Sequence, residues 1–183
     1  AAPAVVKRAN IDGTNPESII TANSEADLVG EIQVDPSSGT LYYVYYTFGG
    51  NTTIRKANLD GSADADFSTD IGSSNKVSLS IDTKNRSLYF ATADVGIIVG
   101  ISLESQAFTS AFVDPARIIT SIAVDPNDGP RLYFTETAND TISSVKIFEQ
   151  SASPITPTSG GFSQPNHLAL LLAATLSPSV TLV

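Results

Sequence analysis

The sequence predicts an all-β fold, a four-bladed β-propeller of four-stranded antiparallel blades, and a repeat is the main reason. A strand that begins with Leu-Tyr occurs three times, as LYYVYY at 41–46, LYFATA at 88–93 and LYFTET at 132–137. Each copy follows a segment that ends in a turn, namely IQVDPSSG at 32–39, LSIDTKNR at 79–86 and IAVDPNDG at 122–129. A period of about 40 to 50 residues built from short strands is typical of propellers, because one four-stranded unit cannot bury both of its faces without neighbours. The 183 residues divide into four units of about 46 residues.

A second signature marks an outer strand and predicts how the ring closes. RANIDGT at 8–14 returns as RKANLDGS at 55–62 and weakens into GISLES at 100–105 and VKIFEQ at 145–150. The first copy has no inner strands ahead of it. We therefore expect a mixed blade, in which residues 4–26 supply two outer strands and residues 167–183 supply two inner ones. Such a blade leaves no open sheet edge. A larger ring built from two chains is the alternative.

The chain is predicted to form one domain, residues 1–183. A chain of this length buries roughly 70% of its unfolded surface, which is enough for a core without disulfides. The Gly/Ser/Pro-rich stretches at 61–75 and 150–165 fall where one repeat gives way to the next, so we interpret them as loops. The longest apolar run, LALLLAA at 168–174, is shorter than the roughly 20 residues that cross a bilayer and predicts a strand buried on both faces.

Within the strands, alternation of side chains predicts where the aromatic residues go. Both faces of a propeller blade meet another blade, so aromatic residues on either face can belong to the core. We expect packing between blades for Tyr42, Tyr43, Tyr89, Phe90, Tyr133 and Phe134. The turn residues Asp35, Asp82 and Asp125 are predicted to accept hydrogen bonds from the backbone two residues on. Asp12-Gly13 and Asp60-Gly61 are predicted to lie in tight turns.

The order of these segments carries a family resemblance. An inner strand with VDP, a strand beginning LYF or LYY, and an outer strand running into NLDGS together resemble the YWTD repeat of the low-density lipoprotein receptor family of propellers. The YWTD positions fall on Tyr42–Tyr45, Tyr89–Thr92 and Tyr133–Glu136, where the tryptophan is always replaced and only Glu136 keeps an acid. The family's aspartate ties neighbouring blades together, so the resemblance implies that other contacts do so here. It also implies an extracellular protein-binding module, with four blades in place of the usual six.

Charge and glycosylation motifs bear on partners and location. The net charge is −9 with no basic cluster, which disfavours nucleic acid and anionic membranes as partners and suits solubility. The sequence contains no Met, and its first residues, AAPAVV, suit the product of signal-peptide removal. Sequons occur at Asn51, Asn85 and Asn139. We therefore expect a secreted protein, with these three residues as glycosylation candidates.

Few residues could carry chemistry. His167 is the one histidine and there is no cysteine, which excludes common zinc sites and leaves a single candidate base without a nucleophile elbow around it. Asp60, Asp64, Asp66 and Asp70 form an acidic loop with a loose likeness to a calcium loop, although the twelfth-position Glu and the Gly placement are missing. We expect an ordinary solvated loop and no cofactor, with a cation in the central channel as the one open alternative.

Two classes of function remain. The first and favoured one is a non-catalytic recognition module that binds a glycan, as a lectin does, or an extracellular protein through loops on one face. These loops are expected at 46–53, 93–97 and 137–141, beside 22–28, 71–76, 113–118 and 157–166. The candidate ligand-binding residues are Tyr45, Tyr46, Phe48, Asp94, Asp140 and His167. The alternative is a propeller-type hydrolase, lactonase or lyase with its site at the channel mouth.

Overall fold

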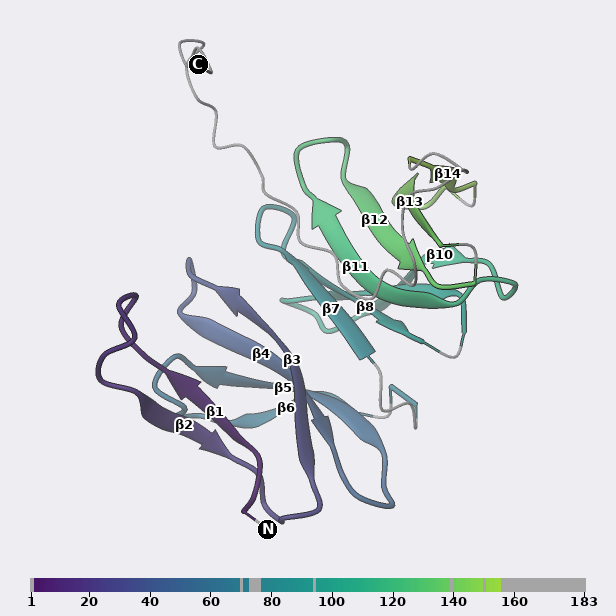
Figure 1. Cartoon of the computed structure of the whole chain (residues 1–183). Helices are drawn as coiled ribbons and strands as arrows, with labels where there is room; N and C mark the ends of the chain where they lie inside the picture. Colours follow the sequence, from purple (N-terminus) through teal and green to yellow (C-terminus); the bar gives the residue numbers. More distant parts are fainter. Residues whose placement is uncertain are drawn as a thin grey trace.

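The computed structural model describes residues 2–69, 71, 72, 77–93, 95–138, 140–149 and 151–155, and its fold is all-β (Figure 1). Half-blade A is a two-stranded sheet of β1 (Val5–Arg8) and β2 (Glu17–Thr21). Blade B consists of β3 (Leu28–Asp35), β4 (Thr40–Tyr46), β5 (Thr52–Asn58) and β6 (Ala65–Ser68). Blade C consists of β7 (Val77–Asp82), β8 (Ser87–Thr92), β9 (Ile97–Ser102) and β10 (Phe108–Val113). Blade D consists of β11 (Ile119–Asp125), β12 (Arg131–Glu136), β13 (Thr141–Lys146) and β14 (Ser153–Pro154).

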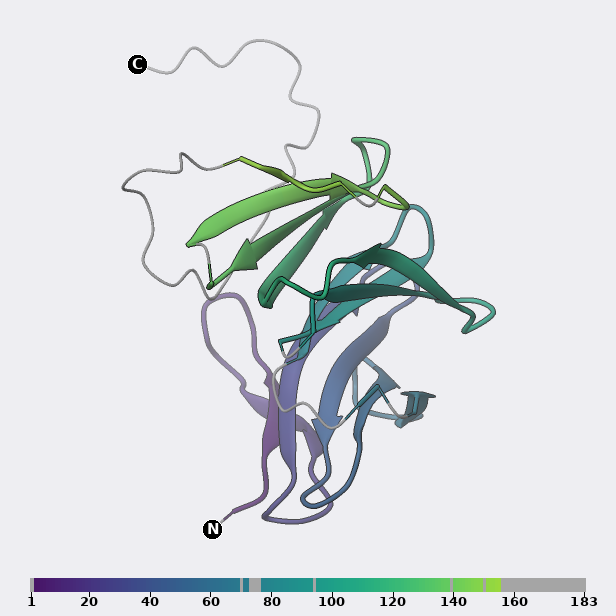
Figure 2. The same ribbon diagram turned by 90° about the vertical axis from the view of Figure 1, so that its right-hand side faces the viewer.

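The sheets follow one another in chain order around the molecule (Figures 1 and 2). Within each sheet, every strand pairs antiparallel with the next strand in sequence. The first strand of one blade lies beside the first strand of the next, with β7 between β3 and β11. This is the arrangement of propeller blades, and four sheets fit a four-bladed propeller. The predicted outer strands within residues 4–26 are β1 and β2. The predicted inner strands of the mixed blade, residues 167–183, lie outside the described residues.

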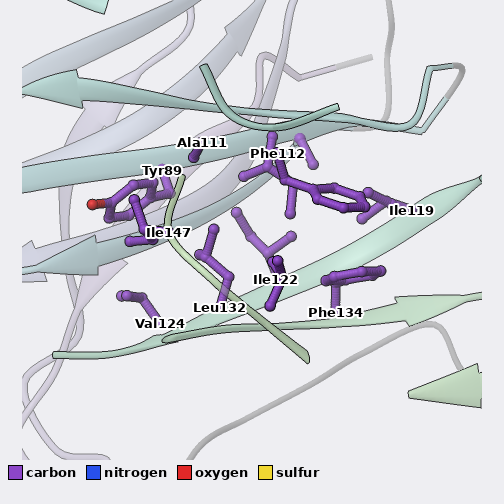
Figure 3. Packing of buried hydrophobic residues seen from close by; sticks show 12 residues of the cluster. Tyr89, Ala111, Phe112, Ile119, Ile122, Val124, Leu132, Phe134 and Ile147 are labelled. Atoms are coloured by element: carbon purple, nitrogen blue, oxygen red, sulfur yellow. The ribbon is translucent and has the colours of Figure 1, made fainter. Parts of the chain in front are cut away.

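Three apolar clusters fill the spaces between sheets. The first joins half-blade A to blade B through Val6, Ile20 and Tyr43, and the second joins blades B and C through Tyr42, Leu79 and Phe90. The third joins blades C and D, where the rings of Phe112 and Phe134 lie with centroids 5.2 Å apart (Figure 3). The neighbours Tyr42 and Tyr43 thus serve opposite faces of β4, as the period of two requires. Packing between blades is confirmed for the buried aromatic residues Tyr42, Tyr43, Tyr89, Phe90 and Phe134, whereas Tyr133 is half-buried.

The predicted turns are built from the same bonds in successive repeats. Asp12 accepts hydrogen bonds from the amide (2.9 Å) and hydroxyl (2.7 Å) of Thr14, and Asp60 accepts equivalent bonds from Ser62 (2.9 and 2.6 Å). Asp35 accepts the amide of Ser37 at 3.0 Å, two residues on, which confirms its predicted role as a turn cap. Asp125 does the same with the amide of Asn127 at 2.8 Å, and Asp82 accepts the amide of Asn85, three residues on, at 2.8 Å.

Polar side chains of the first strands tie the blades together. Ser78 and Ser80 of β7 accept hydrogen bonds from the amides of Ile122 (3.1 Å) and Val124 (2.9 Å) of β11. Glu31 of β3 accepts the amide of Leu79 in β7, and the Gln33 side chain donates to the Leu79 carbonyl at 3.1 Å. These bonds satisfy backbone groups at strand edges that no neighbouring strand pairs with, which a buried edge requires. They join blade B to blade C and blade C to blade D.

Candidate functional site

The two ends of the sheets differ in what they expose. We call one end the interblade end, because the connections between blades leave from it, described at 22–27, 69, 71, 72 and 114–118, together with hairpin loops described at 47–51, 93, 95, 96, 137, 138 and 140. The other end, the Asp-turn end, carries the turns at 36–39, 83–86 and 126–130. Antiparallel order places all of these loops, because successive connections alternate between the two ends. The loops that the sequence grouped on one face lie at the interblade end, as far as they are described.

Exposed apolar side chains lie at the interblade end, beside few exposed charges. The large exposed apolar residues there are Val5, Leu28, Phe48, Val95, Val113, Ile118 and Ile155. Among the described residues, the exposed charged side chains at this end are Glu25 and Asp140. The Asp-turn end carries many more exposed charges, including Arg8, Asp12, Asp60, Lys84, Glu104, Asp128, Lys146 and Glu149. Exposed apolar side chains with few charges between them indicate a binding face better than a highly charged surface does.

At the interblade end, buried polar side chains fix the backbone of the loop that carries Phe48. Asp27, which is buried, accepts the backbone amide of Phe48 at 3.0 Å and the hydroxyl of Tyr45 at 2.9 Å. Tyr45 in turn accepts the amide of Asn23 at 2.8 Å. The bond from Phe48 and then that from Tyr45 lower the pKa of Asp27, so the carboxylate stays charged. The Phe48 side chain is 79% exposed while Tyr45 is 6% exposed, so Phe48 presents its ring and Tyr45 anchors the loop.

Tyr46 also acts in support of the loops. Its hydroxyl accepts the amide of Val77 in blade C at 3.1 Å, which ties the end of β4 to the next blade. A Cβ on Gly30 would lie 2.7 Å from the Tyr46 ring, so the ring packs directly on the β3 backbone and a larger residue at position 30 would have to displace it. Among the other candidate ligand-binding residues, Asp140 is exposed at the interblade end with φ of 51°, and Asp94 and His167 lie outside the described residues.

Glu136, the one acid kept at the YWTD positions, joins blades C and D. It is fully buried and accepts a hydrogen bond at 2.6 Å from Arg117, which lies in the connection between the two blades. Arg117 also pairs with Asp114 at 2.7 Å, and this bond, ahead of other contributions, lowers the pKa of Asp114. Tyr45 occupies the repeat position of Glu136 and likewise binds the connection that precedes its own blade, through Asp27. Two different chemistries therefore perform one structural task, which the sequence pattern did not reveal.

Aspartates of the predicted acidic loop accept hydrogen bonds from side chains of neighbouring strands. Arg55 donates to Asp64 at 3.1 Å and to Asp66 at 2.7 Å, and the Tyr43 hydroxyl donates to Asp64 at 2.7 Å. Burial and then the bond to Asp64 raise the pKa of Tyr43, which stays protonated. Asp60 is occupied in its turn, and Asp70 lies outside the described residues. The described part of the chain brings together no group of three His, Cys, Asp or Glu that could hold a metal ion.

Two of the three sequon asparagines, Asn51 and Asn85, are among the described residues. Asn51 is exposed beside Phe48 at the interblade end, and Asn85 is exposed at the Asp-turn end, where its side-chain amide donates to Asp82 at 2.7 Å. Asn139 lies outside the described residues.

Within the described residues, no helix is long and apolar enough to cross a membrane.

Comparison with known proteins finds similarity at the level of structure. No protein-family model matches the sequence, and no curated protein matches it significantly. Among solved structures, a chain of a nidogen/laminin complex aligns with a TM-score of 0.69 and 16% identity, over 84% of this chain and 56% of that one. TolB from Acinetobacter baumannii aligns with a TM-score of 0.66 and 16% identity, over 86% of this chain and 38% of that one. The fold is that of a β-propeller.

A third solved structure has a similar fold. Regucalcin from Agrobacterium tumefaciens strain C58, described as a calcium-binding protein, aligns with a TM-score of 0.55 and 10% identity, over 70% of this chain and 45% of that one. The chain thus spans between 38% and 56% of the length of these three proteins. At such low identity the alignments show the fold alone, and function has to be argued from the side chains.

Proposed function

We propose that this propeller is a non-catalytic recognition module that binds a partner protein through the interblade end. The observation that carries the proposal is the exposed ring of Phe48, whose loop is fixed by the buried Asp27 and Tyr45. An apolar side chain on a loop whose backbone is already fixed binds well, because the loop loses little conformational freedom when the partner covers it. Aromatic anchors of this kind dominate the energetics of protein interfaces.

A protein partner fits this surface better than a glycan. A lectin site stacks the flat face of a sugar on aromatic rings and surrounds it with polar groups, and of the tyrosines proposed for that purpose Tyr45 is buried and Tyr46 is bonded to Val77. The other large exposed apolar side chains at this end are aliphatic, among them Leu28, Val95 and Ile118. Aliphatic and aromatic side chains with few charges are typical of the centre of a protein interface. A precedent for such use of the fold is the structure of nidogen in complex with laminin.

The proposal includes an extracellular location, which rests on the sequons. A glycan on Asn51 would stand three residues from Phe48 and shield part of the binding surface. We therefore expect one of two arrangements. Either Asn51 carries no glycan when the partner binds, or the partner contacts the side of Phe48 that faces away from Asn51.

Binding to a panel of purified extracellular proteins tests the proposal, with Phe48→Asn as the variant and Phe148→Asn as its control. Phe148 is also exposed but lies at the Asp-turn end, and its φ of 73° is one that Asn tolerates. We expect saturable binding that weakens at least about tenfold in Phe48→Asn, as for an interface hot spot, and stays within about twofold in Phe148→Asn. Equal losses in both variants would contradict the proposal. Sugar-inhibitable binding on a parallel glycan array would make the protein a lectin, and turnover of lactone or ester substrates would favour the enzyme alternative.

A further inference from the structure

A small cavity of about 80 Å³ lies between blades C and D, near the Asp-turn end. Residues of blade C line it together with two residues that follow β13, among them Tyr89, Gly100, Thr109, Ala111, Ile147 and Phe148. Tyr89, Ala111 and Ile147 lie together at one end of the C–D cluster (Figure 3). Thr109 and Phe148 are exposed, so the cavity opens to solvent on their side.

The cavity exists because two residues of blade C are smaller than their counterparts in blade B. Tyr89 of blade C and Tyr42 of blade B hold the same position, second in the Leu-Tyr segment. On the third strand, Lys56 lies opposite Tyr42, whereas Gly100 lies opposite Tyr89. Residues directly opposite each other share one face of a sheet, so Gly100 leaves a hollow beside the Tyr89 ring.

The fourth strands differ in the same way. Each contains a bulge, and the extra residue there is Phe67 in β6 and Ala111 in β10. The Phe67 ring is 3% exposed and packs against Tyr42 in a T-shaped arrangement, with centroids 5.1 Å apart and an interplanar angle of 73°. The ammonium group of Lys56 lies 5.6 Å from the centre of the Phe67 ring. An aromatic ring therefore fills the space between blades B and C that is hollow between blades C and D.

We propose that the cavity between blades C and D binds one aromatic ring of a ligand, in the place that the Phe67 ring takes between blades B and C. Such a ring would meet Tyr89 edge to face, which is a preferred geometry of aromatic pairs. An enclosed cavity of about 150 Å³ holds a whole benzene ring, and this one is roughly half that size, so the ring enters edge first and stays partly exposed. Ser87 and Ser102 also line the cavity, and their hydroxyl groups suit a ring that carries one polar substituent.

Phe148 adds a second observation at the mouth of the cavity. Its φ of 73° is one that bulky residues rarely adopt, and its ring is 68% exposed. Its amide donates to the carbonyl oxygen of Ala111 at 3.2 Å, which holds this residue of blade D against blade C. Backbone strain of this kind concentrates at sites that bind ligands. The site lies near the Asp-turn end, so the inference does not depend on what the interblade end binds.

A titration of the full chain with phenol, followed by the backbone amide signals in NMR spectra, tests the proposal. We expect saturable shifts at Gly100 and Thr109 and none at Phe48. Cyclohexanol, a ring of similar size without aromatic character, should bind at least about threefold more weakly, because it cannot make the edge-to-face contact. N-acetyltyrosinamide distinguishes the sources of the ring. Tighter binding of this compound than of phenol indicates an aromatic side chain of a peptide, and weaker binding indicates a free small molecule.

Two variants of β10 locate the site. Thr109 and Ser110 are both exposed, and their side chains point to opposite faces of the sheet. Thr109→Phe places a ring across Gly100 and should weaken phenol binding at least about tenfold, whereas the matched control Ser110→Phe should stay within about twofold.

Three results overturn the proposal, and the first two need no variant. They are the absence of saturable shifts at Gly100, equal binding of phenol and cyclohexanol, and equal losses in Thr109→Phe and Ser110→Phe. None of these results affects the proposed binding of a protein at the interblade end, which the Phe48→Asn variant tests separately.

Discussion

Apolar side chains pack between blades C and D and also between half-blade A and blade B. The two interfaces differ in how many strands contribute buried side chains. The C–D cluster draws on all three of the strands β11, β12 and β13, through Ile122, Phe134 and Val145. Figure 3 labels Ile122 and Phe134. The A–B cluster is built mainly on β4 and β5, through Tyr43 and Ala57, and leaves Ile32 of β3 outside it. The difference teaches that an apolar side chain in a propeller is buried by the neighbouring blade, and its own strand cannot bury it.

The largest expected effect comes from breaking the complete interface. Phe134→Ala removes a fully buried ring that packs on Phe112 and should lower the free energy of unfolding by about 3–5 kcal/mol. Urea denaturation followed by circular dichroism measures the change. The matched control, Phe108→Ala, removes an exposed ring from β10 and should change stability by less than about 0.5 kcal/mol. Similar losses in both variants would mean that the C–D cluster is not the core of this half of the molecule.

The next prediction compares one repeat position across the two interfaces. Ile122→Ala should cost about 2–4 kcal/mol, because the residue is buried between β7 and β11. Ile32→Ala should cost less, on the order of 1 kcal/mol or below, because Ile32 is 40% exposed. The two variants are compared by urea denaturation in the same buffer. Equal losses in the two variants would mean that Ile32 is as well buried in solution as Ile122.

Two equivalent glycines test the contact between half-blade A and blade B. Gly13 and Gly61 have φ values of 81° and 84°, so alanine is strained at both by about 1–2 kcal/mol. A Cβ on Gly61 would also lie 1.8 Å from the carbonyl oxygen of Ile19 in β2, whereas nothing lies within 4 Å at Gly13. Gly61→Ala should therefore destabilise the fold by about 1–3 kcal/mol more than Gly13→Ala does. Equal melting temperatures for the two variants would show that this contact gives way without cost.

A smaller effect is expected where Arg86 joins blade C to blade B. Gly39, Arg86 and Gly129 share one turn position with positive φ (67°, 53° and 65°), and only Arg86 carries a side chain, which donates to the buried Asp35. Arg86→Gly relieves about 1 kcal/mol of backbone strain but removes a charged hydrogen bond of about 1.5–3 kcal/mol. The net expectation is a loss of about 1 kcal/mol, measured by thermal unfolding. A gain in stability would mean that the pair with Asp35 is the weaker of the two terms.

The smallest effect is a dependence of stability on pH. Burial alone would raise the pKa of Asp35, but hydrogen bonds from Ser37, Arg86 and Ser38 outweigh it and hold the pKa well below 3.8. Asp27 is shifted in the same direction by Phe48 and Tyr45. A carboxyl group whose pKa is lowered by folding stabilises the fold above its unfolded pKa, and this stabilisation is lost as the pH falls below about 3.8. The urea midpoint should be flat from pH 7 to 5 and fall below pH 4, less steeply in Asp35→Asn. An equal slope in that variant would assign the acid sensitivity to other groups.

Sequence reasoning located most of the strands but few of their partners. The Leu-Tyr segments at 41–46, 88–93 and 132–137 fall on β4, β8 and β12 within one residue at each end. The site was harder, because Tyr45 and Phe48 are close in sequence and both aromatic, yet one is buried and the other exposed. Ser78 and Ser80 stand 47 residues after Glu31 and Gln33, and this equal spacing was a signal that could have revealed the ties between blades.

The sequence by itself determined the repeat, the alternation of side chains and the turn chemistry, since each depends on residues within a few positions of one another. Only the tertiary structure decided which neighbour each face meets, and therefore that Tyr45 binds Asp27, that Glu136 binds Arg117, and that Phe48 points outward. The reason is physical. Both faces of a blade are apolar, so a period of two tells which residues share a face but carries no information about the blade that covers it.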